Sequence, residues 1–450
     1  MSLPGDPGGE DNLHFAGLAL TEFWERLALS GVKSMLTLLL INQVLPASPS
    51  VLGMSWLQGL LSPITSSDGP GVALASYIYG VANALVYLAV PLGGFVGDLL
   101  IGRRAAVLAG GASMAGGLLL MTSLYGFMPG LLLFASGAGL LKSNLSAQFG
   151  GLFGEEAKRR RAYSWYLVFL NAGVICGPLA MGAVALAFGW RHALVLAAVS
   201  VVAGMSTYLL LIKASAGTAL LRQATRRQEG RRASEPRAVT RLWLVLLAGY
   251  LCFAAYGQVA NIVLVWAETN VDLDFGFGAV PVGWLLALDG LFTILLIFIV
   301  QAISGLLGRR GVVIGPHVQI ILGCLACAAG YLVLILADGA GGSPVSLTWL
   351  LAYLLLVDLA VVLVWPSGLS LATGLAPNGR AGGWGGLFYL YGFFASLWVG
   401  FAGGYFQSLE MADFWLIHAG VALLGAALAL VAALLARPLS PGRQAMTTSA

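Results

Sequence analysis

The chain has 450 residues, of which 59% are hydrophobic and 9% charged, and its mean hydropathy is +0.90. Ordinary soluble proteins carry roughly 25% charged residues, so this chain has too little charge to cover a surface that faces water. The composition indicates a polytopic helical membrane protein and excludes soluble enzymes, nucleic-acid binders and secreted disulfide scaffolds. The net charge of +4 is uninformative until the individual charges are placed.

Apolar runs long enough to cross a bilayer, about 20 residues each, follow one another after a polar N-terminal segment. That segment lacks the basic start of a signal peptide, so we expect the chain to retain it. We predict twelve transmembrane helices. Their ranges are 15–44, 72–101, 104–126, 129–152, 162–189, 192–213, 241–267, 278–307, 313–337, 346–373, 382–407 and 413–436.

The positions of the basic residues predict the orientation of these helices. With both termini in the cytoplasm, the 23 Lys and Arg residues all fall in cytoplasmic segments except Arg26, Lys33, Lys142 and Arg191. Cytoplasmic loops of membrane proteins carry an excess of Lys and Arg, and an odd number of helices would scramble the pattern. The sequence therefore predicts a multi-pass protein of the cell (inner, cytoplasmic) membrane.

A long basic cytoplasmic segment divides the chain into two halves. We predict an N-terminal six-helix bundle over residues 1–213, a basic linker over 214–240 and a C-terminal six-helix bundle over 241–450. The basic residues of the linker either bind anionic lipid or remain solvated and only fix the topology.

The two halves share a short cytoplasmic turn, Gly-Arg-Arg, which ends with Arg103 and Arg104 in one half and with Arg309 and Arg310 in the other. Two related six-helix bundles describe the major facilitator fold, in which the substrate binds between the bundles near the midplane. We expect both turns to brace a cytoplasmic gate, with Asp98 paired to an arginine. There is no phosphate-binding loop, so this chain alone does not use ATP.

Charged residues inside predicted helices are the first candidates for function. Each costs roughly 2.5–3.5 kcal/mol at the bilayer centre if it is unpaired. These residues are Glu22, Glu25, Arg26, Lys33, Lys142, Asp289 and Asp358.

The first helix carries four of these charges on one face, because Glu22, Glu25, Arg26 and Lys33 follow helical spacing. We expect Glu22 to pair with Arg26, and Glu25 to need a partner from another helix, for which Lys142 is the nearest cation. Burial disfavours a charged carboxylate whereas nearby cations favour it, so Glu25, or else Glu22, is predicted to bind the proton that drives transport. The alternative is a static ion-pair cluster that joins helices.

Several motifs resemble the proton-dependent oligopeptide transporter (POT, or PTR) family, and together they cover most of the chain. The ExxER signature is present as Glu22-Phe23-Trp24-Glu25-Arg26. It is followed in order by GGFVGDLLIGRR from Gly93, GAGLLKSN from Gly137, YLVFLNAGVICGP from Tyr166, GQVAN from Gly257 and WPSGLSLATGLAP from Trp365.

The resemblance implies roles for individual residues. Glu22, Glu25, Arg26 and Lys142 match the proton-coupling residues of the family. Arg26, Lys33, Tyr87, Lys142, Asn171 and Gln258 fall at substrate-site positions. In the family, cations of the N-terminal half take the carboxylate of the peptide, and a glutamate of the tenth helix takes its amino group.

The sequence departs from the family in its substrate half. The tyrosine pair that follows ExxER is Leu29-Ser30, the glutamate of the tenth helix falls on Val361, and the serine before Pro366 is Trp365. Asp358 lies one turn from the missing glutamate and is the first candidate to replace it, with Asp289 the second. The alternative is that both aspartates are interior polar residues without a ligand. The two additional helices common in bacterial members are also absent.

These features favour a proton-coupled symporter, and not an enzyme, that imports di- or tripeptides or a peptide-like solute. We expect no metal and no cofactor other than the coupling proton, a bilayer and a small substrate as partners, no nucleic acid, and a monomer. The alternative is a proton-driven antiporter that exports a drug or secondary metabolite, which the altered substrate half and Trp365 motivate. A receptor or scaffold that transports nothing is the third hypothesis.

Overall fold

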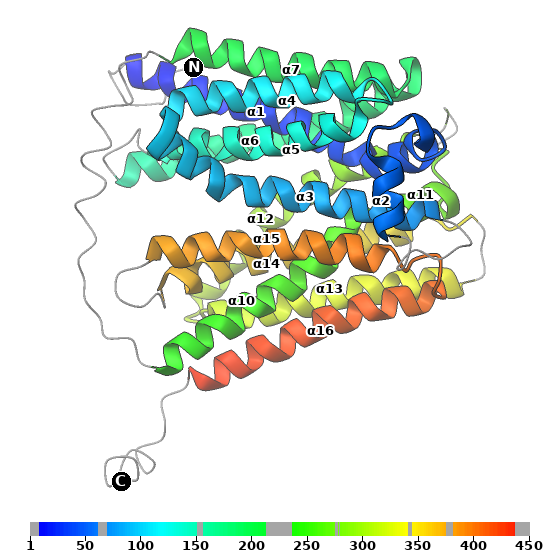
Figure 1. Ribbon diagram of the computed structural model, residues 1–450. Coiled ribbons are helices and arrows are strands. Elements are labelled where there is room, and N and C mark those ends of the chain that lie inside the picture. The colour runs from blue at the N-terminus through cyan, green and yellow to red at the C-terminus, as the bar shows by residue number, and fades with distance from the viewer. Residues whose placement is uncertain are drawn as a thin grey trace.

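The computed structural model describes residues 9–61, 70–150, 156–212, 236–274, 278, 280–340, 344–374 and 381–436. This part of the chain is almost entirely helical (Figure 1), and its β-structure is limited to one isolated bridge between Val271 and Val345. The predicted all-α fold is therefore confirmed. Most of the predicted linker, residues 214–235, lies outside the described residues.

Each of the twelve predicted ranges coincides with a long helix. In the N-terminal half these are α1 (Gly9–Leu39), α3 (Pro70–Val96), α4 (Arg103–Met121), α5 (Phe127–Gly150), α6 (Glu156–Phe188) and α7 (Trp190–Leu211). In the C-terminal half they are α10 (Pro236–Tyr256), α12 (Leu285–Arg309), α13 (Pro316–Gly339), α14 (Leu347–Gly374), α15 (Ala381–Gly403) and α16 (Met411–Leu435). Ten of the described helices are long and apolar enough to cross a membrane, and α5 and α15 occupy the other two predicted ranges.

The prediction of one continuous helix over 241–267 is wrong, because this segment is interrupted in the structure. A 3-10 turn (Gly257–Ala260) follows α10, the backbone departs from helical geometry at Asn261 (φ −127°, ψ −99°), and α11 (Ile262–Asn270) then continues to the extracytoplasmic end. The side chains of Gln258 and Asn261 make hydrogen bonds to neighbouring elements, so tertiary contacts compensate for the interrupted helix. A short helix, α2 (Met54–Leu61), was also not predicted.

The helices form two groups that follow the order of the chain. In Figure 1 the helices from α1 to α7 lie in the upper half of the view, whereas α10, α13, α14, α15 and α16 lie in the lower half; α11 appears at the height of α3. Within the groups, α1 packs on α6 and α7, α4 on α5, and α13 on α14 and α16; between the groups, α3 packs on α15 and α6 on α12.

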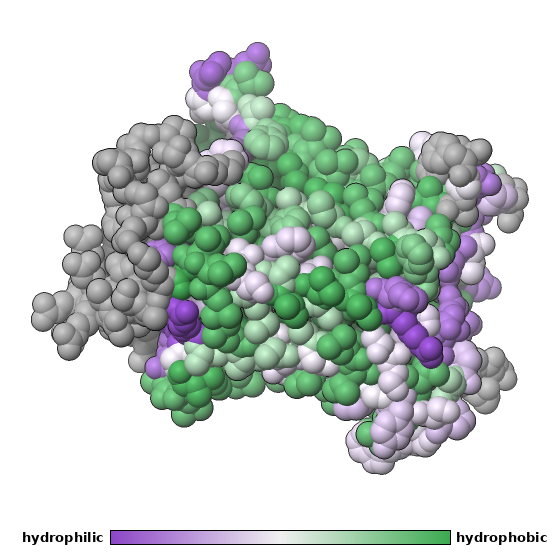
Figure 2. Space-filling view, turned by 90° about the horizontal axis from the view of Figure 1, so that it is seen from above, coloured by the Kyte–Doolittle hydropathy of each residue, from purple (hydrophilic) through white to green (hydrophobic). Residues whose placement is uncertain are grey.

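The outer surface is that of a protein surrounded by lipid. Figure 2 shows apolar side chains over the middle of one face and hydrophilic side chains gathered toward its ends. Large apolar residues are exposed on many helices, including Phe298 and Ile303 on α12 and Leu424 on α16. An apolar band between polar ends is what membrane-spanning helices require.

The two halves meet over the extracytoplasmic part of their helices, from the helix ends down to Asn83 in the middle of α3. Thr37 Oγ1 donates to Asn261 Oδ1 at 3.0 Å, Asn261 Nδ2 donates to Ser76 Oγ at 2.7 Å, and Asn83 Nδ2 donates to Ser396 Oγ at 2.9 Å. These five residues, which we call the outer seal, join α1 and α3 of one half to α15 and the helix break of the other.

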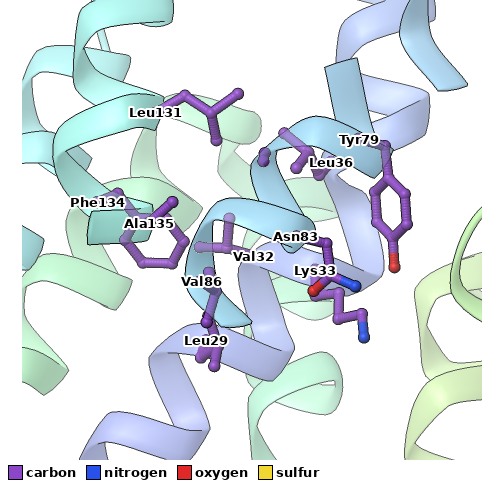
Figure 3. Close-up of a pocket in the computed structure, with 11 residues that line it drawn as sticks. Leu29, Val32, Lys33, Leu36, Tyr79, Asn83, Val86, Leu131, Phe134 and Ala135 are labelled. Atoms are coloured by element: carbon purple, nitrogen blue, oxygen red, sulfur yellow. The ribbon is translucent and has the colours of Figure 1, made fainter. Parts of the chain in front are cut away.

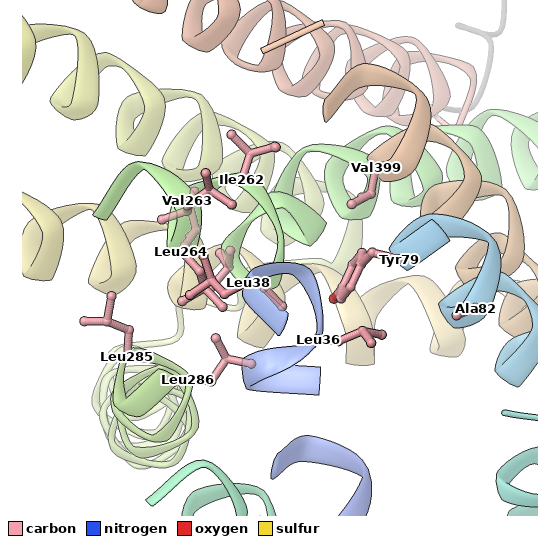
Figure 4. Close-up of a cluster of buried hydrophobic side chains, with 14 of the residues drawn as sticks. Leu36, Leu38, Tyr79, Ala82, Ile262, Val263, Leu264, Leu285, Leu286 and Val399 are labelled. Atoms are coloured by element: carbon pink, nitrogen blue, oxygen red, sulfur yellow. The ribbon is translucent and has the colours of Figure 1, made fainter. Parts of the chain in front are cut away.

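An apolar cluster lies beside the outer seal. Figure 4 shows Leu36 and Leu38 of the first half beside Val263, Leu264 and Leu286 of the second. The extracytoplasmic side of the interface is therefore closed by packed side chains as well as by hydrogen bonds.

Candidate functional site

A cavity of about 320 Å³ lies between the two halves, below the outer seal. Side chains of both halves line it. Of the residues predicted to bind substrate, the lining includes Arg26, Lys33, Tyr87, Lys142, Asp289 and Trp365. Asn83 of the outer seal also lines the cavity, although no sequence motif pointed to it.

The ExxER residues form a buried ion cluster on α1. Arg26 Nε and Nη2 donate to the two carboxylate oxygens of Glu25 at 2.5 and 2.8 Å, and Arg26 Nε lies 3.3 Å from Glu22 Oε1. Glu22 is 1% exposed, Glu25 2% and Arg26 9%. Two parallel N–H···O bonds make a strong, well-oriented ion pair with Glu25, and Arg26 thus compensates the charge of the buried carboxylates.

The expectation that Glu25 needs a partner from another helix is not met. Neighbouring residues on a helix usually point in different directions, but the long arginine side chain folds back onto Glu25 and forms a two-pronged pair. The Tyr166 side chain of α6 also lies beside Glu22 and interacts with it. Tyr166 begins one of the quoted family motifs, but its uncharged side chain gave no sign of a role in the cluster.

Lys142 of α5 lies near this cluster without joining it directly. No carboxylate lies within 4 Å of its amine among the residues that the structure describes, yet it is close enough to Glu22, Glu25 and Arg26 for electrostatic interaction. The two carboxylates and the two cations balance in formal charge. Protonation of either glutamate would leave the group with an excess positive charge.

Lys33 provides a third cation of the N-terminal half. Figure 3 shows Lys33, Asn83 and Tyr79 with their polar ends on the same side, opposite Phe134 and Leu131. A small cavity of about 30 Å³ lies between these two groups. Lys33 lines both this small cavity and the main cavity.

The C-terminal half contributes carboxylates to the site. Tyr256 of α10 donates from its hydroxyl to both carboxylate oxygens of Asp289 on α12, at 3.0 and 3.1 Å. Asp289 lines the cavity and interacts electrostatically with Lys33. The cavity therefore has cations on its N-terminal side and a carboxylate on its C-terminal side.

Aromatic rings form part of the same C-terminal wall. The centroid of Phe253 lies 5.5 Å from that of Trp365 and 4.7 Å from that of Tyr391, and Trp365 and Tyr391 are 5.6 Å apart. All three line the cavity. These rings give the wall an apolar surface suited to a side chain of a ligand.

Three predicted substrate residues do not line the cavity. Asn171 donates from Nδ2 to the Leu167 carbonyl of its own helix at 2.8 Å. Gln258 is buried behind Val399, to whose carbonyl it donates at 3.1 Å. Asp358 lies behind Asp289 and is fully buried.

The predicted gate residues lie at the cytoplasmic turns. Arg103 Nε donates to Asp98 Oδ1 at 2.6 Å, and Arg104 Nη1 donates to the Ile212 carbonyl at the end of α7 at 2.9 Å. Arg309 and Arg310 lie exposed at the end of α12. These contacts brace the turn of the N-terminal half, and a role of the four arginines in gating remains a prediction.

The model of the Major Facilitator Superfamily matches residues 47–400. A di-/tripeptide transporter of Lactococcus lactis subsp. cremoris is 25% identical over 430 residues, which cover 79% of the chain and 82% of that relative. The peptide transporter YePEPT of Yersinia enterocolitica is 23% identical over 474 residues, covering 88% of each.

The arrangement of the helices is similar to that of solved structures. A crystal structure of a peptide transporter POT in complex with sulfate has a TM-score of 0.78 and 22% identity, and covers 94% of each chain. A POT family transporter in complex with 5-aminolevulinic acid has a TM-score of 0.79 and 18% identity, covering 94% of this chain and 96% of the other. At these identities the structural likeness establishes the arrangement of the helices alone.

Proposed function

Because the chain belongs to the Major Facilitator Superfamily, we propose that its cavity carries a short peptide, and that a proton gradient drives import of this substrate by alternating access. The protein is a multi-pass membrane transporter and not an enzyme. The predicted resemblance to the POT family is confirmed by relatives that are named as di- or tripeptide transporters, at identities that fit a divergent member.

The observation that carries the proposal is the charge arrangement of the cavity. Arg26, Lys33 and Lys142 lie on its N-terminal side and Asp289 on its C-terminal side. A short peptide carries a carboxylate at one end and an ammonium group at the other, so its charges complement these two walls. The volume of about 320 Å³ lies at the lower end of the range of ligand pockets and fits a small solute.

Within this proposal, Asp289 takes the place of the missing glutamate at Val361. It lines the cavity, whereas Asp358, the first candidate from the sequence, lies behind it. Asp289 therefore binds the amino group of the peptide, and the three cations bind its carboxylate.

Proton coupling is proposed to take place in the ExxER cluster. Arg26 contacts Glu22 and Glu25 and also lines the cavity. Protonation of Glu25 weakens its hold on Arg26 and leaves the guanidinium free to bind the substrate carboxylate. Proton binding and substrate binding thereby support each other, as symport requires. The transporter is proposed to act as a monomer in the bilayer.

Export of a different small molecule is the second candidate function. The aromatic wall of Phe253, Trp365 and Tyr391 would suit an apolar compound, and the family glutamate is absent at Val361. The sequence relatives favour import, because they are named as peptide transporters.

The decisive experiment is uptake of labelled dialanine by proteoliposomes that contain the purified protein. An imposed potential of about 100 mV, negative inside, supplies about 2.3 kcal/mol per proton, which corresponds to roughly fifty-fold accumulation. We expect accumulation that a proton-conducting uncoupler abolishes. Absence of accumulation by correctly folded protein, together with drug resistance in cells that express it, would instead support export.

Glu25→Gln is the test of the coupling site. We expect this variant to lose uptake driven by a proton gradient, because glutamine cannot release a proton, while exchange of substrate across the membrane persists. Glu410→Gln, an exposed residue at the start of α16, is the matched control and should retain uptake. Proton-driven uptake by Glu25→Gln at the wild-type rate would refute the assignment.

A further inference from the structure

A pair of carboxyl groups in the C-terminal half is separate from the ExxER cluster. Asp289 of α12 and Asp358 of α14 lie within hydrogen-bonding reach of each other. Asp358 is 0% exposed, and its Oδ1 accepts a hydrogen bond from Thr293 Oγ1 at 3.2 Å. Two carboxylates at this distance and depth cannot both be ionised at low cost.

The surroundings of the two aspartates are unequal. Asp289 accepts two contacts from the Tyr256 hydroxyl and interacts with Lys33. Asp358 has no cation within 4 Å among the described residues, and its Oδ2 has no donor there. An oxygen that is buried without a donor and faces a second carboxylate is satisfied if it carries a proton and donates it to Asp289.

We propose that Asp358 binds a proton and shares it with Asp289, so that the C-terminal half has a proton-binding site of its own. The only ligand of this site is the proton. Asp358 does not line the cavity, whereas its partner Asp289 does. Neither the family motifs nor the comparisons assign this site. The inference depends on the proposed function only for its role in transport, since proton binding is measurable without a substrate.

Groups on several helices face this pair. They are Lys33 of α1, Tyr79 of α3, Tyr256 of α10 and Tyr353 of α14. The hydroxyl of Tyr353 donates to that of Tyr331 on α13 at 3.2 Å. Lys33 is thus the single cation that acts on the pair among the described residues, and it belongs to the opposite bundle.

This arrangement links the proton to the distance between the bundles. With the proton bound, the pair carries one negative charge, which the single charge of Lys33 balances. Loss of the proton leaves two adjacent negative charges and strengthens their attraction to Lys33 across the cavity. The proton on Asp358 therefore controls how strongly the C-terminal half attracts α1.

Infrared spectroscopy of the reconstituted wild-type protein at neutral pH tests the site directly, with no substrate present. The protein is labelled with isotopically substituted aspartate, so that bands of Asp carboxyl groups are separated from those of Glu. We expect a band from a protonated aspartic acid in the wild type, and its loss in Asp358→Asn. In Asp289→Asn the band should persist at a shifted frequency, because Asp358 remains buried but has a different hydrogen-bonding partner.

Two further variants keep the test conclusive. Asp338→Asn, an exposed residue at the end of α13, should leave the band unchanged. Thr293→Val removes the donor to Asp358 without removing a carboxyl group, so it should shift the band even if Asp358→Asn fails to fold. Absence of the band in the wild type, its survival in Asp358→Asn, or an unchanged frequency in Thr293→Val would overturn the proposal. Failure of peptide uptake would not affect any of these results.

Discussion

Arg26 is the residue on which the charge balance of the N-terminal half depends. It contacts both Glu22 and Glu25, and the two carboxylates have almost no access to water. Removal of one partner from a buried ion pair leaves an uncompensated charge, which costs far more than the intact pair contributes. Loss of Arg26 leaves two buried carboxylates without their direct partner, whereas loss of one glutamate leaves Arg26 paired with the other.

Arg26→Leu should destabilise the folded protein by about 3–5 kcal/mol, as measured by thermal unfolding in detergent. The loss should be smaller at acidic pH, because protonation of Glu25 then removes one of the charges that Arg26 compensates. Arg191→Leu, which removes an exposed arginine at the start of α7, is the control and should have little effect. Equal stability of Arg26→Leu and the wild type at alkaline pH would show that the cluster is not a buried charge network.

At the level of whole elements, contact between α3 and α15 closes the extracytoplasmic side. The backbones of these helices approach closely where Gly80 faces Gly400, and a Cβ atom on Gly400 would lie 2.9 Å from Gly80 Cα and 3.0 Å from the Ser76 carbonyl oxygen. Only glycine allows this approach. The neighbouring hydrogen bond from Ser76 Oγ to the Gly400 carbonyl, at 3.0 Å, depends on the same spacing.

Gly400→Ala is expected to push α3 and α15 apart and to favour opening toward the extracytoplasmic side. Overpacking of this kind costs about 1–3 kcal/mol, which corresponds to a shift of about 5-fold to 150-fold in the equilibrium. Val86 lines the cavity. The measurement is the rate at which a membrane-impermeant thiol reagent, added outside, modifies the variant Val86→Cys. Gly420→Ala on α16, where a Cβ meets nothing within 4 Å, should leave this rate unchanged. An unchanged rate in Gly400→Ala would contradict the role of the contact.

At the scale of the whole molecule, the halves are in contact on the extracytoplasmic side and the cavity lies below that contact. The contact of α6 with the 3-10 turn that precedes α12 (Val282–Trp284) follows the same pattern. Trp284 Nε1 donates to the Leu179 carbonyl at 3.1 Å, and this turn lies at the extracytoplasmic end of α12. On the cytoplasmic side of these contacts, the cavity is lined by Val90 and Trp365. Both residues lie in the cytoplasmic part of their helices. We infer that the structure represents a state open to the cytoplasm.

A cysteine placed at Val90 should therefore react faster from the cytoplasmic side than from outside. The test uses Val90→Cys in a protein whose exposed native Cys176 is replaced by serine, in right-side-out and inverted vesicles. Adding the substrate should slow the reaction, because the substrate occupies the cavity. Faster labelling from the extracytoplasmic side would mean that the other state predominates in the membrane.

The sequence predicted most of the architecture, because length, hydropathy and the placement of basic residues are properties of each helix alone. All twelve ranges, and the position of Arg26 and Lys142 near one another, followed from such patterns and from the family motifs. The break at Asn261 and the position of Asp358 behind Asp289 did not. Both depend on how separate helices pack, and the helical periodicity of one segment contains no information about its neighbours.

The five side chains of the outer seal have one property in common that bears on how the transporter works: none of them is ionisable in the physiological range. Thr37, Ser76, Asn83, Asn261 and Ser396 exchange their hydrogen bonds with one another for bonds to water when the seal opens, and such an exchange is nearly neutral in free energy. The side chains of the outer seal carry no charge, so neither pH, salt nor membrane voltage acts on them directly. The energy source of transport must therefore act on the charged residues of the cavity. The outer seal opens or closes as a consequence of the changes in those residues.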